Sequence, residues 1–247
     1  MPMCLSAHIY AFARLLLVLA LTACSRETEL PLPDVTTDDL LERGQGELAN
    51  GTAAAAISSF RMVLHRDSLH AEALAGLAQA YRMQGKRRPA ARYMRRAVSQ
   101  TYAAGLTALH DGDSTGAATR FRYALRLHPK HPLAPLRLGE LARAKGDLDK
   151  AIELFQQAIE VNPEYSESFL KLGDAYAETH RPTEAREAYE RAIELNINTF
   201  GAYMGLGRLH ADEGAWSLAA DNYGKALLIQ PGSTEARAGA ARARQNL

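Results

Sequence analysis

Apolar and small residues recur along this chain at a constant interval of 34 residues. Aromatic residues occupy one column of this repeat, at Phe121, Phe155, Tyr189 and Tyr223. Small residues keep the same register at Gly105, Gly139, Gly173 and Gly207, at Ala117, Ala151, Ala185 and Ala219, and at Ala124, Ala158, Ala192 and Ala226. Two helix backbones approach closely only where a small residue faces the partner and a larger side chain fills the adjacent space. The pattern therefore predicts an all-α chain of closely packed helices.

Prolines end three of these stretches. Pro129, Pro163 and Pro231 follow the similar segments YALRLHP, QQAIEVNP and GKALLIQP, and the first two prolines are 34 residues apart. Proline cannot donate the next backbone hydrogen bond, so it ends the second helix of each unit. A 34-residue unit with these columns resembles the tetratricopeptide repeat. The resemblance implies an α-solenoid, in which antiparallel helix pairs stack into a superhelix.

We expect about six units over residues 39–247, of unequal quality. The units within 98–233 match the pattern well, and those within 37–100 match it weakly. The interval from the second unit to Pro129 is shorter than a full repeat, which predicts one long spliced helix from about Pro89 to about His110. Proline is tolerated in the first turn of such a helix. Residues 234–246 are alanine-rich and are interpreted as a helix that caps the array.

The first 23 residues have the order of a signal peptide. Arg14 precedes a short apolar run that begins at Leu15, and small residues follow. The run is too short to cross a bilayer, which needs about 20 apolar residues. A buried helix or a signal anchor is the alternative interpretation.

The segment Leu21-Thr22-Ala23-Cys24 resembles the lipobox of bacterial lipoproteins. That resemblance implies cleavage before Cys24 and acylation of its thiol and new amino group, and two or more acyl chains hold a protein stably on a membrane. Ser25 is not the aspartate that this family uses for retention in the inner membrane. The resemblance thus implies an outer-membrane protein that faces the periplasm. Residues 24–38 contain two prolines and no apolar period, and they read as a flexible tether up to about 45 Å long.

Composition argues against catalysis. Both cysteines, Cys4 and Cys24, lie in the first tenth of the chain, which excludes a disulfide-built body and a cysteine metal site there. No common nucleotide-binding, metalloprotease or serine-hydrolase motif occurs. His128 and His131 could form part of a metal clip, but no third ligand is near in sequence, and polar loop residues are the simpler interpretation. We expect no enzyme activity, cofactor, metal or small-molecule substrate.

The net charge of +1 conceals two oppositely charged halves. Residues 61–130 contain thirteen basic and four acidic side chains, and residues 133–199 contain thirteen acidic and eight basic ones. The densest basic patch comprises Lys86, Arg87, Arg88, Arg92, Arg95 and Arg96. An exported chain would not meet nucleic acid, so anionic lipid, cell-wall polymer or an acidic partner remains possible. The alternative interpretation is that these residues form the solvent-exposed face of a long helix and bind nothing.

In resembling families, the first helix of each hairpin lines the binding groove. The corresponding residues here are Leu133, Leu136, Glu140, Arg143, Glu167, Leu170, Asp174, Glu178, Met204, Arg208 and Asp212. This mixed and rather acidic set favours a peptide with basic and apolar side chains. Ordinary solvent exposure of the same residues is the alternative.

Outer-membrane lipoproteins with such repeats include pilus and secretion assembly factors of the TadD-like and pilotin-like groups. The resemblance implies a lipid-anchored scaffold that binds a protein or peptide in the periplasm and assists assembly of an envelope machine. An adaptor or regulator of cell-wall or exopolysaccharide enzymes is the alternative function.

Overall fold

A computed structural model describes residues 35–247. The predicted signal peptide, Cys24 and the predicted tether up to residue 34 lie outside the described residues. The predicted tether extends to residue 38, but Thr37 and Asp38 belong to the first described helix, which Thr36 caps. Within residues 35–247 there are twelve helices and no strand, so the all-α prediction is confirmed. The helices are α2 (Thr37–Ala49), α3 (Ala53–Arg66), α4 (Ala71–Met83), α5 (Arg87–His110), α6 (Ser114–Leu127), α7 (Ala134–Ala144), α8 (Leu148–Val161), α9 (Ser166–Glu178), α10 (Pro182–Leu195), α11 (Phe200–Asp212), α12 (Trp216–Ile229) and α13 (Thr234–Gln245).

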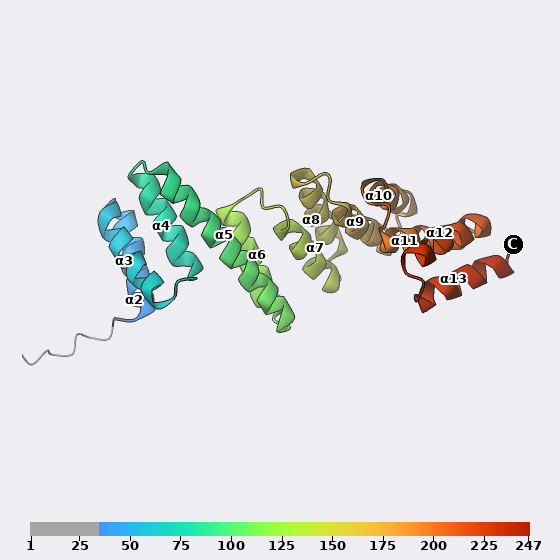
Figure 1. The fold of residues 1–247 in the computed structure, drawn as a ribbon, viewed down its shortest axis with the longest axis horizontal. Helices are drawn as coiled ribbons and strands as arrows, with labels where there is room; N and C mark the ends of the chain where they lie inside the picture. Colours follow the sequence, from blue (N-terminus) through green and yellow to red (C-terminus); the bar gives the residue numbers. More distant parts are fainter. Residues whose placement is uncertain (1–34) are drawn as a thin grey trace, which may run out of the picture.

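The helices form an elongated array of antiparallel hairpins, which runs from α2 and α3 at one end to α13 at the other (Figure 1). Tight turns join the two helices of each hairpin. Glycines at five of these turns have φ between 71° and 81°, a backbone conformation that L side chains disfavour. His180 occupies the sixth turn with φ 57°. The repeat therefore fixes a left-handed residue after the first helix of every unit, even where glycine is absent.

In every described hairpin except α4–α5, an aromatic ring of the second helix packs on a glycine of the first helix. Phe155 is fully buried, and a Cβ atom built on Gly139 would lie 2.5 Å from its ring. Tyr189 is packed on both sides, against Gly173 of its own hairpin and Gly205 of the next one. These contacts explain the sequence columns, because a side chain larger than hydrogen would occupy the space that the ring fills.

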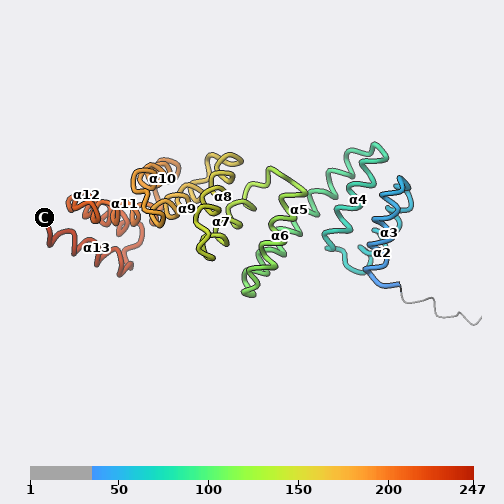
Figure 2. The backbone as a smooth tube through the Cα atoms, turned by 180° about the vertical axis from the view of Figure 1, so that it is seen from behind, coloured from blue at the N-terminus to red at the C-terminus, as the bar shows by residue number. Residues whose placement is uncertain are grey.

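Helix α5 is a single helix of 24 residues over the stretch where the sequence predicts two units to overlap. Its first half packs against α4, and its second half packs against α6 (Figure 2). Gly105, in the second half, lies against the Phe121 ring as the first-helix glycines of the later units do. One helix thus serves as the second member of one hairpin and the first member of the next.

The array ends with α13, which packs against α12. Ala236, Ala240 and Ala243 are buried, whereas Arg237 and Arg244 are exposed on the outer side. The helix therefore covers the last hairpin and presents polar side chains to solvent. No helix among residues 35–247 is long and apolar enough to cross a membrane.

Candidate functional site

The first helices of the last three hairpins, α7, α9 and α11, carry the predicted groove residues. Glu140, Arg143, Glu167, Leu170 and Asp174 are partly buried, and Glu178, Arg208 and Asp212 are exposed. Ion pairs connect α7 with α9 and α11 with α13 across this surface. The structure thus brings most of the predicted groove residues onto successive helices of one surface.

Two of the predicted contact residues, Leu136 and Met204, are buried. Leu136 has no exposed area, because it packs in the same apolar cluster as Phe155 and Leu172. Met204 is only 3% exposed, and it contributes to the wall of a cavity between α11 and α13 of about 390 Å³. The prediction that Leu136 contacts a partner is wrong, since its side chain belongs to the core. Leu133, one turn earlier, is partly exposed.

Charged groups in the centre of the groove neutralise one another. The Arg143 guanidinium lies 2.5 Å from Glu178 Oε1 and 3.4 Å from Asp174 Oδ2. The Tyr189 hydroxyl donates a hydrogen bond of 3.0 Å to Asp174 Oδ1. Burial nevertheless raises the pKa of Asp174, with Arg143 and Tyr189 opposing that shift. Asp174 is therefore engaged by Arg143 and Tyr189 and offers no free charge to a ligand.

A second network lies nearer the start of the groove. Arg137 Nη1 and Glu140 Oε2 are 2.7 Å apart, and Lys171 Nζ lies 3.7 Å from the other carboxylate oxygen of Glu140. The Tyr165 hydroxyl donates to Glu167 at 2.7 Å. Glu167 and Asp212 form no ion pair within residues 35–247. They are the carboxylates of this surface with charge left for a basic ligand.

The basic patch lies at the other half of the array, where α4 turns into α5. Lys86, Arg87, Arg88, Arg92 and Arg95 are exposed. Arg96 differs, because its guanidinium donates a 3.1 Å hydrogen bond to the Ser68 carbonyl in the α3–α4 turn. The α4–α5 turn and the start of α2 lie at opposite ends of the first hairpins (Figure 1). The patch therefore lies at the opposite end of these helices from the start of α2.

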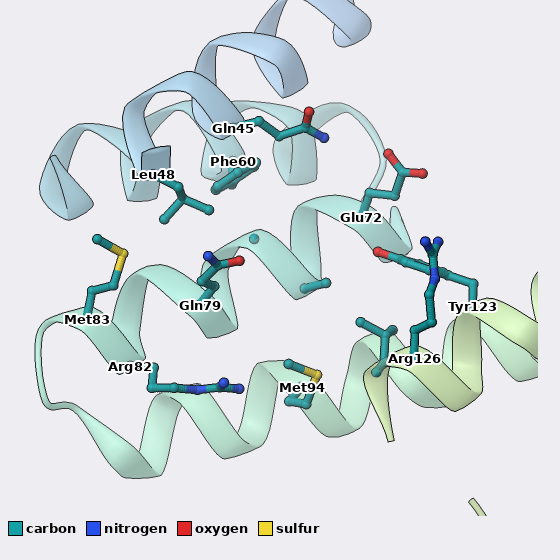
Figure 3. Close-up of a pocket in the computed structure, with 13 residues that line it drawn as sticks. Gln45, Leu48, Phe60, Glu72, Gln79, Arg82, Met83, Met94, Tyr123 and Arg126 are labelled. Atoms are coloured by element: carbon teal, nitrogen blue, oxygen red, sulfur yellow. The ribbon is translucent and has the colours of Figure 1, made fainter. Parts of the chain in front are cut away.

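The structure also contains a cavity of about 600 Å³, and none of the predicted groove residues lines it. It lies between α2, α4, α5 and α6, and side chains from all four helices point toward it (Figure 3). The groove positions of the later units, counted along α4, give Glu72, Ala75, Gln79, Arg82 and Met83, all of which line this cavity. The repeat register could therefore have identified the α4 residues. The α6 residues that line the cavity could not have been identified in this way, because they reach it only through the packing of α5 against both α4 and α6.

His131 has a structural role at the start of α7. Its Nδ1 accepts backbone hydrogen bonds from Leu133 at 3.3 Å and Ala134 at 3.0 Å, and its ring lies 4.7 Å from the Tyr102 ring. Burial lowers the pKa of His131, and the nearby His128 lowers it further. Within residues 35–247, no group of three or more His, Cys, Asp or Glu side chains is placed to hold a metal ion. His131 caps a helix, which accounts for its position.

Acidification should therefore destabilise the α7 end of the array. The neutral imidazole is the acceptor, and its pKa is lower in the folded protein than the ordinary 6.5, so this contribution is present above pH 6.5 and is lost as the pH falls through the folded-state pKa. A helix cap contributes about 0.5–2 kcal/mol. His131→Asn, which retains an acceptor that does not titrate, should have a smaller fall in thermal midpoint between pH 7.5 and 5 than the parent. His128→Gln, the control, should retain most of the pH dependence. Equal slopes for the parent and His131→Asn would contradict this role.

Comparisons with known proteins agree with this architecture. A family model described as tetratricopeptide repeat matches residues 41–101 and 102–168, and a second model with that description matches residues 142–198. No curated protein sequence matches the chain.

Solved structures show the same fold. The chain is similar to one in the crystal structure of the APC/C hetero-tetramer Cut9-Hcn1, with 20% identity and a TM-score of 0.55 over 86% of this chain and 43% of that one. This chain therefore spans less than half the length of that relative. It is also similar to pilF of Pseudomonas aeruginosa, with 20% identity and a TM-score of 0.53 over 83% of this chain and 97% of that one. At these identities the likeness concerns the fold alone. Because the family models match more than half of its residues, the chain belongs to the tetratricopeptide repeat family, whose members are typically non-catalytic scaffolds that bind protein partners.

Proposed function

We propose that this protein is a non-catalytic scaffold, anchored by lipid on Cys24 to the bacterial outer membrane, that holds a protein partner in the periplasm. Its role is to assist assembly of an envelope machine such as a pilus or a secretion system. The observation that carries the scaffold proposal is the surface of α7, α9 and α11, where partly exposed side chains lie on three successive hairpins and ion pairs connect α7 with α9. The anchor and the location are supported by the lipobox-like sequence that ends at Cys24.

The geometry favours an extended or helical segment as the bound group. The groove crosses three helices, so a segment lying along it would contact several repeats in turn. Arg143 and Lys171 are each paired with carboxylates, whereas Glu167 and Asp212 have no ion-pair partner within the described residues. A ligand with basic side chains would complement those two carboxylates, and its apolar side chains would contact Leu170.

Site-specific photo-crosslinking in cells tests this proposal. A photoreactive residue at Asp212, in the groove, should give discrete adducts on irradiation. The same residue at Glu187, which is exposed on α10 outside the predicted groove set, is the control and should give few. Adducts that contain pilin or secretion components support the assembly role, and adducts that contain cell-wall or polysaccharide enzymes support the alternative function. Identical adducts from both positions would refute the groove as the binding surface.

The anchor is tested by Cys24→Ala. Without the thiol, the chain cannot accept the diacylglycerol group, so metabolic labelling with a fatty acid should be lost. Stable anchoring takes two or more acyl chains, and the variant should therefore leave the outer-membrane fraction. Cys4→Ala, the matched control, should retain both label and fractionation. Unchanged acyl label in Cys24→Ala would disprove the lipoprotein assignment.

A further inference from the structure

The cavity between α2, α4, α5 and α6 has the dimensions of a binding site. Its volume of about 600 Å³ is within the range of about 300–1,000 Å³ found for ligand pockets. Met83 from α4 and Met94 from α5 approach it from two helices, with Leu48 of α2 opposite (Figure 3). Met83 is 46% exposed, so its side chain is accessible to a ligand. Methionine side chains adapt to ligands of different shape, so this apolar region suits an inserted side chain.

The continuous helix α5 creates the cavity. Because α5 packs against α4 through its first half and α6 through its second, it brings side chains of α6 to the space beside α4. Tyr123 and Arg126 of α6 stand opposite Arg82 and Met83 of α4 (Figure 3). The spliced helix predicted from the shortened repeat interval thus has a direct structural consequence.

The polar lining of the cavity carries excess positive charge. Arg82 and Arg126 are both exposed, and neither belongs to an ion pair within residues 35–247. The Arg126 guanidinium lies 5.0 Å from the centre of the Tyr123 ring, which holds it at the cavity. Glu72 is the only carboxylate among the lining residues. In the groove of α7, α9 and α11, by contrast, Arg143 and Arg208 both have carboxylate partners.

We propose that this cavity is a second binding site, which takes an acidic peptide segment of a partner protein. An apolar side chain of the segment enters between Met83 and Met94, and its flanking carboxylates pair with Arg82 and Arg126. The surplus of nine positive charges over residues 61–130 supports an acidic partner at this half of the array. The site is separate from the groove proposed above, and it does not depend on the lipid anchor.

Fluorescence anisotropy of defined peptides against the full chain in detergent micelles tests this site. The probe is a short labelled glutamate-rich peptide with one central leucine. It should bind about tenfold more tightly than a lysine-rich peptide with the same leucine, and more tightly than a glutamate-rich peptide in which serine replaces leucine. Its affinity should fall as the salt concentration rises. Equal affinity for the glutamate-rich and lysine-rich peptides would overturn the proposal.

Paired charge reversals locate the site. Arg82→Glu/Arg126→Glu should weaken binding of the glutamate-rich leucine peptide about tenfold or more. Arg88→Glu/Arg92→Glu makes the same change in net charge at exposed arginines of the basic patch outside the cavity, and it should weaken binding much less. Equal losses in the two double variants would show that the peptide responds to overall charge alone, and would overturn the site. Gln79→Glu, which adds one carboxylate to the lining, provides an independent variant if the first double variant does not fold; it should also weaken binding.

An occupant from the same chain is the competing outcome. The segment before residue 35 contains Glu27, Glu29 and Asp34 together with two leucines. If that segment fills the cavity, Glu27→Gln/Glu29→Gln/Asp34→Asn should increase the affinity for the glutamate-rich leucine peptide, because a competitor is weakened. The partner proposal expects unchanged affinity in this variant, and a clear increase would replace the partner with the chain's own segment.

Discussion

Leu136→Ala is expected to lower the free energy of unfolding by about 2–5 kcal/mol, the range observed when a buried leucine is truncated in a packed core. Leu136 has no exposed area and belongs to the apolar cluster that includes Phe155 and Leu172. Truncation removes buried apolar contacts and leaves a cavity between α7 and its neighbours. Because α7 is an internal element of the array, its loss should separate the hairpins on either side of it.

The measurement should resolve parts of the array as well as the whole. Stability in repeat proteins is roughly a sum of terms from each repeat and its neighbours, so unfolding need not occur in one step. Denaturant unfolding followed by circular dichroism should be combined with hydrogen exchange of α7 and α8. Leu133→Ala, at a partly exposed position before α7, is the control and should cost about 1 kcal/mol or less. Equal losses in the two variants would show that Leu136 is not the core residue described above.

Gly44→Ala and Gly46→Ala, two positions apart in α2, should have opposite effects on stability. A Cβ atom at Gly44 would lie 2.7 Å from the buried Phe60 ring, whereas nothing lies within 4 Å of a Cβ atom at Gly46. Overpacking of this kind costs about 1–3 kcal/mol, because the ring or the helix must shift. Replacement of an unconstrained helical glycine by alanine stabilises a helix by about 0.5–1 kcal/mol. Gly44→Ala should therefore destabilise the first hairpin, and Gly46→Ala should stabilise it.

Hydrogen exchange of α2 and α3 is the suitable readout, since these helices form the terminal hairpin and can open alone. The double variant Gly44→Ala/Phe60→Leu tests the cause, because the smaller side chain should relieve part of the clash and leave a coupling free energy between the two sites. A stabilising effect of Gly44→Ala would mean that the ring does not pack on the helix backbone at this hairpin.

Leu136 shows that a position in the repeat does not by itself decide whether a side chain is exposed. Leu136, Leu170 and Met204 occupy one column of the repeat, 34 residues apart, and the repeat pattern predicts all three in the groove. Their burial differs, because Leu136 and Met204 are almost fully enclosed and Leu170 is partly exposed. A column fixes which side of its helix a residue occupies, whereas neighbouring hairpins decide how much of that side is covered.

The charge pattern had a similar limit. Counting charges showed that residues 133–199 are acidic, and this favoured a basic ligand for the groove. The structure shows that Arg143 and Lys171 are paired with carboxylates of neighbouring hairpins. These partners are 31 to 35 residues apart in sequence, so no local pattern indicates them. Free charge at a surface depends on such pairings.

The sequence by itself determined that the chain is a stack of helix pairs, because the small and aromatic columns satisfy a steric requirement that recurs in every unit. Its shortened interval also indicated a helix shared by two units. Only the tertiary structure decided which apolar groove residues are enclosed, which charges are paired, and that α6 forms a wall of the cavity beside α4. Those properties depend on how successive hairpins lie against one another, and the charge pairs concerned join residues 31 to 35 positions apart.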